Sequence, residues 1–482
     1  MKFYKSKYMY AFCVLFVVLG TLQMANAQRN LVMIHGLGGS EGSLKGYQNL
    51  FFNSGPDKRQ SVDAIVNFTM NTANGVSTAA NDAIDQTIQN SPNNNHRSND
   101  IAIAHSLGAV TAREMDRQRI RGGQERMFGG MISLGGVHFG SKFPYKFQDG
   151  SFNAFLSSAC KEPILDPLAA LLGIVPALNQ IQQIFGNFGI TNSNICNWVA
   201  QYGVQQFSGF TTSTINDEKY DSPFLNGSDG LNRFSSATHK IAICGNESSP
   251  VHWRVVSSQT FSNAPTGGLG DGTSDQTLVN IMDDLEIADY IIGGVCSGLA
   301  IGFAFAPSLW SYIPSLIYAA YECFDGAIWL GRSESYYNEL LGANDYIYQP
   351  TPFTVITNSC QNAISSIQSS MYNLNYFSNP TAFWQLYSQR QALLNDPNCW
   401  QTQWLQVAVP LNGQSDGLAT VESQKLPSIS TTQSPAVNIV IDGLNHFELR
   451  DHPKLTNTLL AIFRGSSPDI THPVQRDFFT TP

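Results

Sequence analysis

Short apolar runs alternate with longer amphipathic segments along the first part of the chain. The short runs are bounded by Gly, Asn and Ser, which is typical of buried strands. The longer segments repeat apolar residues at the spacing of a helix face. Strands are predicted at 31–34, 65–70, 101–104 and 131–134, and helices at 76–88 and 107–119. We therefore expect strands and helices to alternate here.

The same alternation returns near the C-terminus. Strands are predicted at 405–409 and 437–441, and a closing helix at 454–463. Strands that alternate with helices are typical of a mostly parallel α/β sheet. Both ends of the chain are therefore expected to contribute to one α/β core.

The predicted core is split by a long insertion. We expect the core to consist of 28–141 and 401–482, and the insertion, which is mainly helical, to occupy 142–400. A strand-like run, I-A-I-C at 241–244, indicates possible core strands near 240–258. A chain of 482 residues is long enough for an enlarged domain of this kind.

The first 27 residues have the features of a secretory signal peptide. Lysines precede a short apolar run at 11–22, and the run is followed by the small-x-small sequence A-N-A at 25–27. The apolar run is shorter than the roughly 20 residues that span a bilayer. We expect cleavage after this segment and a secreted, periplasmic or otherwise extracytoplasmic protein; an N-terminal membrane anchor is the alternative.

Charged residues are scarce. They make up 13% of the chain, against roughly 25% in typical soluble domains. The 29 Phe, 18 Tyr and 7 Trp argue against disorder, and the net charge of −9 argues against a nucleic-acid partner. Three blocks of the insertion, 167–216, 290–321 and 346–389, contain no Asp, Glu, Lys or Arg. The shortage therefore belongs largely to the insertion.

Two of these blocks are strongly apolar. Apolar residues recur at helical spacing over 168–185, where Pro176 is expected to kink or divide the helix. The block at 290–321 is long enough to span a bilayer, but Gly and Pro interrupt it. We expect a buried or interface-seeking helical pair there; a transmembrane helix is the alternative.

The cysteines after the signal segment predict disulfides. Their spacing contains no C-x-x-C, so a zinc site has little support. In an oxidising compartment some of them are expected to pair and to staple the insertion, although the connectivity does not follow from the sequence. Their number is odd, which leaves at least one free or intermolecular: Cys160, Cys196, Cys244, Cys296, Cys323, Cys360 and Cys399.

Ser106 is the candidate nucleophile. It lies in A-H-S-L-G at 104–108, where a predicted strand turns into a predicted helix. A serine at such a turn exposes its Oγ above the sheet, and the residues two before and two after it must be small because strand and helix approach closely. Ala104 and Gly108 meet this requirement. The context therefore favours a catalytic serine over an ordinary strand-to-helix turn.

Two backbone amides are candidates for an oxyanion hole, which acyl transfer needs near its nucleophile. One belongs to Leu107, directly after the serine. The other belongs to Leu37 in H-G-L-G-G at 35–39, because glycines let a loop turn its amides toward a site. No Lys-Ser/Thr follows these glycines, so a phosphate-binding loop is less favoured. His35 is expected to orient the loop, with a role as base as the alternative.

His446 is the candidate general base. It follows the predicted strand at 437–441 and precedes the closing helix, which is where the order serine, acid, histidine places a base. His452 is the rival. It stands before Pro453, so we expect it at the start of the closing helix instead.

The acid partner is less clearly marked. Asp416, in S-D-G-L at 415–418, lies 30 residues before His446 and follows a predicted strand. Its carboxylate would orient the imidazole and stabilise the cationic form. Asp275, in a similar Gly- and Asp-rich turn, and Glu247, after the strand-like run, are the alternatives.

These segments together resemble the secreted lipases and esterases of the α/β-hydrolase superfamily. The sequence I-H-G-L-G-G at 34–39 is similar to the family's H-G-x-G-G oxyanion loop. The segment at 104–108 is similar to the A-H-S-x-G elbow of bacterial triacylglycerol lipases. The segment at 132–141 resembles the strand and T-P-H-x-G-S sequence that follow in those enzymes, with Gly136 and Val137 replacing Thr-Pro.

The C-terminal segments carry the rest of the resemblance. The sequence at 415–423 is similar to the family's D-G-x-V-P acid loop, with Ala419 and Thr420 in place of Val-Pro, and 445–449 is similar to its histidine loop. The resemblance covers roughly 30–140 and 405–465, less than half of the chain. It implies an α/β-hydrolase fold with a large, mainly helical cap, which in lipases opens as a lid at a lipid surface.

We therefore expect a serine hydrolase that cleaves lipid acyl esters, with possible contact between its cap and a lipid surface. A phospholipase or lipid-anchor deacylase, an amide or peptide hydrolase, and a non-catalytic lipid-binding protein are the alternatives. The chemistry needs no cofactor and no metal ligands are predicted, although Asp271 and Asp275 are weak candidates for calcium binding.

Overall fold

The computed structural model divides into two compact units, Met1–Ile347 with Val409–Pro482, and Tyr348–Ala408. Each unit is built around a different sheet. The first contains a sheet of six strands, and the second contains most of a two-stranded sheet, whose strands lie at its N-terminal and C-terminal ends. The structure describes residues 29–52, 62–91, 98–151, 211–248, 313–374, 379–427 and 436–480, with isolated positions between 154 and 300.

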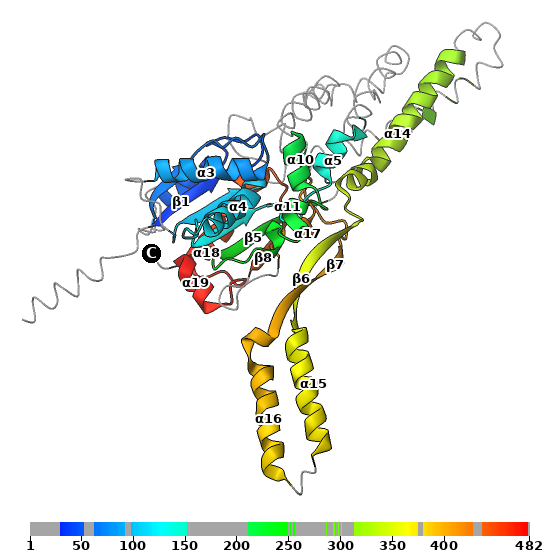
Figure 1. The fold of residues 1–482 in the computed structure, drawn as a ribbon. Helices are drawn as coiled ribbons and strands as arrows, with labels where there is room; N and C mark the ends of the chain where they lie inside the picture. Colours follow the sequence, from blue (N-terminus) through cyan, green and yellow to red (C-terminus); the bar gives the residue numbers. More distant parts are fainter. Residues whose placement is uncertain are drawn as a thin grey trace, which may run out of the picture. The chain divides into compact units, whose positions relative to one another are not determined.

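The first unit contains a sheet of six strands in the order β2-β1-β3-β4-β5-β8, and Figure 1 shows helices packed around it. Every neighbouring pair in this sheet is parallel. The predicted parallel α/β architecture is therefore confirmed. The strands are β1 (Arg29–Ile34), β2 (Val62–Asn67), β3 (Ile101–His105), β4 (Gly130–Leu134), β5 (His239–Asn246) and β8 (Val437–Asp442).

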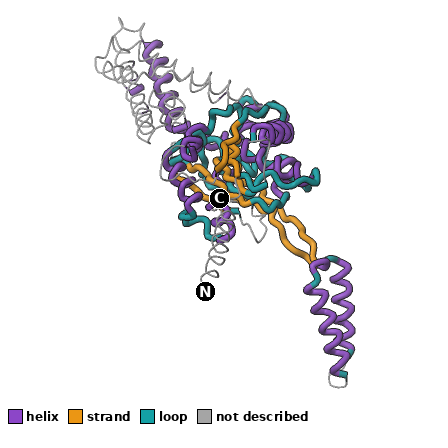
Figure 2. Tube along the Cα trace, turned by 90° about the vertical axis from the view of Figure 1, so that its left-hand side faces the viewer, coloured by secondary structure: helices purple, strands orange, loops and turns teal. Residues whose placement is uncertain are grey.

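Helices lie on both faces of this sheet (Figure 2), and the inner strands are buried. Side chains alternate along a strand, so Val32 and Ile34 of β1 join one hydrophobic core while Leu31 and Met33 join the other. Such strands are continuous apolar runs because neither face meets water. The first core is covered by α3 (Val76–Asn90) and α4 (Leu107–Arg121), and the second by α2 (Lys45–Phe52), α18 (Pro453–Arg464) and α19 (Pro473–Thr480).

The covering helices follow from local sequence. In α3 the buried residues include Val76, Ala79, Ala80 and Ala83, at the three- and four-residue spacing of one helix face. The small alanines let α3 and α4 pack closely. Helix α18 starts after His452, whose imidazole accepts a hydrogen bond from the Lys454 amide at 3.1 Å. The prediction that His452 belongs to a helix start is thus confirmed.

The remaining described helices of the first unit are short, apart from one. They pack around the carboxyl end of the sheet or lead away from it. They are α5 (Phe143–Gln148), α10 (Thr212–Glu218), α11 (Pro223–Asn226), the 3-10 turn η4 (Leu231–Arg233), the long α14 (Ile313–Leu341), α17 (Val421–Gln424) and the 3-10 turn η7 (Glu448–Arg450).

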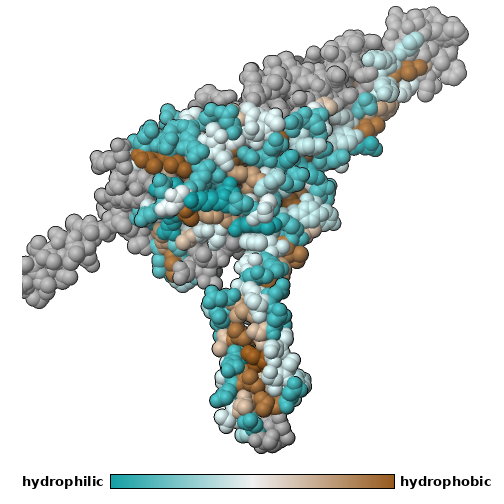
Figure 3. Space-filling model, viewed as in Figure 1, coloured by the Kyte–Doolittle hydropathy of each residue, from teal (hydrophilic) through white to brown (hydrophobic). Residues whose placement is uncertain are grey.

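The second unit consists of a strand pair and a helical hairpin. Strands β6 (Tyr346–Ile356) and β7 (Trp400–Pro410) form the two-stranded sheet, and helices α15 (Asn358–Asn373) and α16 (Pro380–Asn395) pack against each other, with the 3-10 turn η6 (Pro397–Cys399) after them. Hydrophobic side chains lie along the seam between the two helices (Figure 3).

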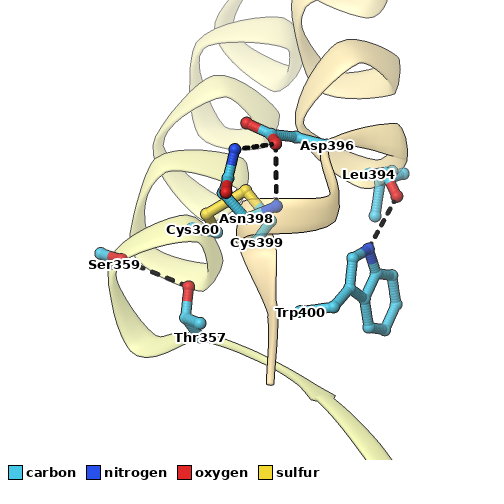
Figure 4. Close-up of a disulfide and its surroundings, with 8 residues drawn as sticks. All are labelled: Thr357, Ser359, Cys360, Leu394, Asp396, Asn398, Cys399 and Trp400. Carbon is cyan, nitrogen blue, oxygen red and sulfur yellow. Dashed lines mark hydrogen bonds between the residues drawn. A yellow bond between two sulfur atoms is a disulfide. The ribbon is translucent and has the colours of Figure 1, made fainter. Parts of the chain in front are cut away.

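A disulfide closes the base of this hairpin. Cys360 in the first turn of α15 bonds to Cys399 directly before β7 (Figure 4), and the Thr357 amide donates a hydrogen bond to the Cys399 carbonyl at 2.8 Å. The expectation of a disulfide within the insertion is confirmed for this pair. Cys244, by contrast, is buried in the core of the first unit. Cys160, Cys196 and Cys296 lie outside the described residues.

One predicted core strand was wrong. The segment 405–409 does form a strand, but as part of β7 it pairs with β6 and not with the central sheet. The place beside β8 is taken by β5, from the run that indicated only possible core strands. The physical reason is burial: Ile241 and Ile243 are fully buried between two helical layers, whereas Leu405 remains 58% exposed.

Several predictions fall outside the described residues: the signal peptide at 1–27, the amphipathic helix at 168–185 and the turn that carries Asp271 and Asp275. Of the apolar block at 290–321, only its end at 313–321 belongs to a described element, α14. Within the described parts of the chain, no helix has both the length and the apolar character needed to cross a membrane.

Candidate active site

Ser106 occupies a strained turn between β3 and α4. Its φ and ψ are 56° and −129°, and Asn412 is the only other non-glycine residue with positive φ among the described residues. A conformation of this kind costs on the order of 1–3 kcal/mol and persists only where the surroundings hold it. Here the Ser106 amide donates to the Leu134 carbonyl of β4 at 2.9 Å. The turn therefore presents Ser106 at the carboxyl edge of the sheet.

Two glycines allow the chain to pass close to this turn. A Cβ on Gly108 would lie 2.4 Å from the His35 carbonyl oxygen, and a Cβ on Gly36 would lie 2.7 Å from Cβ of Ser106. Real Cβ atoms do not approach so closely, so larger residues would separate the segments. The requirement for a small residue two positions after Ser106 is explained by this contact. The loop after β1 is thereby pressed against the serine.

His446 and Asp416 form a hydrogen-bonded pair. His446 Nδ1 lies 2.7 Å from Asp416 Oδ2, and the His446 amide donates to the Asp416 carbonyl at 2.8 Å. A carboxylate only accepts hydrogen bonds, so Nδ1 carries the proton and Nε2 is left as an acceptor. Asp416 is fully buried and His446 nearly so. The pairing fixes the orientation of the imidazole.

The Asp416 loop is itself tied down. Oδ1 accepts from the amides of Leu418 and Ala419 at 3.0 and 2.7 Å. The Ser415 carbonyl accepts from the Glu247 amide at 2.8 Å, at the end of β5. The loop is thus positioned by the carboxyl end of β5, not by the strand that precedes it in the sequence. Both carboxylate oxygens are engaged, which leaves the side chain one orientation.

The alternative acid and base candidates lie elsewhere. Glu247 Oε2 accepts from Asn445 Nδ2 at 3.1 Å, so its carboxylate supports the loop before His446 and does not bond the imidazole. Asp275 lies outside the described residues. His35 accepts from the Met70 amide at 3.0 Å through Nε2, and burial lowers its pKa. A neutral His35 with both ring nitrogens engaged braces the loop after β1.

His105 is a contact of His446 that the sequence did not single out. Its Nε2 donates to the His446 carbonyl at 2.9 Å, and the two ring centres are 4.8 Å apart. Burial, together with the neighbouring His446, holds the pKa of His105 well below its usual range. His105 is therefore a neutral donor that fixes the backbone of His446. Its position beside Ser106 in the A-H-S-L-G segment was the available signal.

Ser106 and His446 line the same cavity, which has a volume of about 220 Å³. The loop that carries Leu37 forms one wall. The amide of Leu107 is the first of α4, and the first amides of a helix lack partners within it. The cavity has a mixed lining of glycines, polar side chains and six apolar residues, namely Leu37, Val137, Phe143, Pro144, Leu418 and Phe447.

Two charged residues of the cavity were not predicted. Glu218 ends α10 and is only 4% exposed; burial, and then the nearby Asp217, raises its pKa to about 8. Arg450 donates from Nε to the Phe447 carbonyl at 3.0 Å, and its guanidinium lies over the Phe447 ring. The sequence offered one weak signal for Glu218: it belongs to the first charged cluster after the block at 167–216.

No protein-family model matches the sequence, and no curated protein matches it. The fold and the site define the chain as a parallel α/β protein in which a serine at a strained strand-to-helix turn shares a cavity with a carboxylate-bound histidine. Among the residues that the structure describes, no group of His, Cys, Asp and Glu is arranged to hold a metal ion.

Proposed function

We propose that the protein is a serine hydrolase of the α/β-hydrolase type that cleaves carboxylic esters through Ser106, His446 and Asp416. The observation that carries the proposal is the shared cavity: Ser106, on its strained turn, and His446, oriented by Asp416 at 2.7 Å, line the same space. Nucleophile, base and orienting acid are the components that acyl transfer needs.

In the proposed mechanism, Ser106 Oγ attacks the ester carbonyl while Nε2 of His446 takes its proton. Asp416 keeps the proton of Nδ1 in place and stabilises the imidazolium that forms. The amides of Leu37 and Leu107 donate to the oxyanion. These donors are part of the backbone and need no rearrangement during the reaction, which is the source of their effect.

The leaving alcohol then receives the proton from His446, and an acyl-enzyme remains on Ser106. Water, deprotonated by Nε2 of His446, attacks this ester in the second half of the reaction. His105 takes part only through the carbonyl of His446, whose position it fixes at 2.9 Å. The proposed chemistry uses side chains and backbone amides of this chain alone.

Lipid acyl esters are the proposed substrates. Apolar side chains such as Phe143, Leu418 and Phe447 line part of the cavity that contains Ser106 and suit the acyl chain of an ester. We also propose that the insertion at 142–400 serves as a cap and that the protein acts outside the cytoplasm. The disulfide between Cys360 and Cys399 supports that location, because such bonds persist in oxidising compartments.

Hydrolysis of a short p-nitrophenyl ester tests the proposal. Wild type should turn the ester over, and Ser106→Ala should lower kcat by a factor on the order of 10⁴ or more, because the nucleophile is removed. Ser40→Ala is the matched control. Ser40 lines the same cavity, but it is exposed and its hydroxyl has no role in the proposed mechanism, so its loss should leave kcat within about twofold.

The rate on an anilide of the same acid separates an esterase from an amidase. Turnover of the ester that far exceeds turnover of the anilide supports an ester hydrolase. A comparable rate on both would assign the site to amide or peptide hydrolysis. Wild type that turns over neither, after detergent treatment, would contradict the proposed catalytic role and leave lipid binding as the alternative.

A further inference from the structure

We propose that Glu218 forms a binding subsite for a positively charged group, an alkylammonium, inside the cavity that contains Ser106. The proposal deepens the proposed function, since it assigns a substrate class to the same cavity: esters that carry an ammonium group. Glu218 lines this cavity with Ser106 and His446, yet the acyl-transfer mechanism gives its carboxyl no role.

The backbone holds Glu218 firmly at the cavity wall. Its carbonyl accepts from the Ser141 amide at 2.7 Å, and Gly140 lies so close that a Cβ there would come within 2.6 Å of the same oxygen. Helix α10, which ends at Glu218, is attached to α3 because Asp217 accepts from the Val76 amide at 2.9 Å. The carboxyl is therefore presented by a fixed backbone, as a binding group should be.

The carboxyl group itself has no partner in the described part of the chain. None of the hydrogen bonds or ion pairs formed there involves its oxygens, although only 4% of Glu218 is exposed. Buried glutamates are almost always paired, and a buried acceptor without a partner is unfavourable. Because Glu218 lines the cavity, a ligand in the cavity is a partner that its carboxyl can take.

The surrounding charges favour a cation over an anion. Asp217 is the charged residue that acts on the pKa of Glu218 within the described structure, and it is acidic. Arg450 lies on the side of the cavity near His105 and affects the pKa of that residue, not that of Glu218. A cation beside Glu218 therefore meets negative charge, and the ring of Phe143 adds an aromatic face to the same cavity.

Binding of a cation is expected to release a proton. With a pKa of about 8, roughly nine in ten Glu218 carboxyls are protonated at pH 7. An ammonium group favours the ionised form, so the proton leaves to solvent as the ion pair forms. Uptake of a neutral molecule of the same shape leaves the carboxyl protonated, so it releases none.

Calorimetry on the Ser106→Ala protein tests this without any turnover. The probes are (3-hydroxypropyl)trimethylammonium and its uncharged isostere 4,4-dimethylpentan-1-ol, titrated at pH 7 in two buffers of different ionisation enthalpy. We expect the ammonium to bind about tenfold more tightly than the isostere, as the attraction between an ammonium and a carboxylate in a partly buried site provides, and to release close to one proton. Equal affinity, or binding without proton release, would overturn the proposal.

Two variants locate the effect. Glu218→Gln, which keeps the size of the side chain, should abolish both the preference and the proton release. Asp217→Asn removes the neighbouring charge and keeps a side-chain oxygen for the Val76 amide. Because Glu218 itself remains, this variant should retain the preference in reduced form, with less proton release. If Glu218→Gln fails to fold, the Ser106→Ala protein with its intact Glu218 still tests the proposal, through the relative affinity of the two probes and the number of protons released.

Turnover distinguishes this inference from the proposed function. The p-nitrophenyl ester of an ω-trimethylammonio acid should show a kcat/KM about tenfold above that of the ω-tert-butyl isostere, and the ratio should fall to about one in Glu218→Gln. Selective calorimetric binding without hydrolysis of either ester would support the cation subsite and contradict the hydrolase. Hydrolysis of both esters at equal kcat/KM would contradict the subsite alone.

Discussion

The two units of the chain use apolar residues in opposite ways. In the first unit the inner strands β1, β3, β4 and β5 are buried on both faces, and residues such as Leu31, Ile103 and Ile243 are fully inaccessible. In the second unit, Pro350, Ile364 and Cys399 are the only buried residues among those described, while Tyr372 and Trp384 remain more than half exposed. A similar content of apolar residues thus produces a core in one unit and not in the other.

The difference lies in the layers available to cover a strand. Helices lie on both faces of the central sheet, so every apolar side chain of β3 or β5 finds neighbours. The second unit has one strand pair and one helical hairpin, and the core of a unit this small rarely supplies more than about 3–5 kcal/mol. The disulfide between Cys360 and Cys399 adds stability there that a small core does not supply. The proposed chemistry belongs entirely to the first unit.

The largest expected effect concerns the acid of the first unit. Asp416→Asn should lower kcat for an ester by about 10⁴-fold, because the amide cannot hold His446 in the tautomer with a free Nε2. Steady-state kinetics on the folded variant measures this loss. Glu247→Gln is the control, since its carboxylate bonds Asn445 and not His446, and it should retain most of the activity. Near-normal activity of Asp416→Asn would move the acid to Glu247 or Asp275.

Loss of the disulfide should destabilise the second unit and leave the activity of the first unchanged. Cys360 and Cys399 are 39 residues apart, and closing a loop of that length stabilises by about 4 kcal/mol in the chain-entropy account. Cys360→Ser should therefore expose the segment 348–408 to limited proteolysis while ester hydrolysis continues. Ser359→Ala, at the exposed neighbouring position, should leave proteolysis unchanged. Loss of hydrolysis along with the hairpin would show that the site needs the second unit.

Paired truncations test the difference in burial directly. Ile243→Ala in β5 removes a fully buried side chain and should lower the free energy of unfolding by about 3 kcal/mol. Leu405→Ala in β7 removes one that is 58% exposed and should change it by less than about 0.5 kcal/mol. Chemical denaturation measures both. Equal effects would contradict the assignment of β5, in place of β7, to the central sheet.

The pH dependence of stability should report the buried Glu218. Its pKa is raised from 4.5 to about 8, so between these values the unfolded chain has lost a proton that the folded chain keeps. The free energy of unfolding therefore falls as pH rises through this window. Relative to Glu218→Gln, wild type should lose about 3 kcal/mol between pH 5 and pH 8. A difference that does not change with pH would mean that Glu218 is not buried.

Most of the central sheet could be predicted because its signals are local. The strands at 31–34, 101–104 and 131–134 are short apolar runs, and each is found within a residue or two of its predicted position. The misplaced strand shows the limit. L-Q-V-A-V at 405–409 has the alternation of a half-buried strand, but whether a layer covers it depends on contacts with distant segments. No local pattern contains that information.

The residues of the candidate site also fall into two groups, those with a local sequence signal and those without one. Ser106, Asp416 and His446 were found because each lies in a short segment with a recognisable order of small, acidic and aromatic residues. Glu218 was not, because its place in the cavity comes from contacts with Gly140 and Ser141, far away in the sequence. Its burial, and hence its pKa, is a property of the assembled fold and leaves no periodic trace in the chain.

The most direct test of the central claim is to locate the residue that a fluorophosphonate probe modifies. Wild type, treated with detergent to open any cap, should gain one adduct, and peptide mapping by mass spectrometry should place it on Ser106. The reaction depends on the nucleophile that His446 activates, so His446→Ala should suppress it. An adduct on another serine of the cavity, such as Ser43, or the absence of any adduct, would contradict the assignment of Ser106 as the nucleophile.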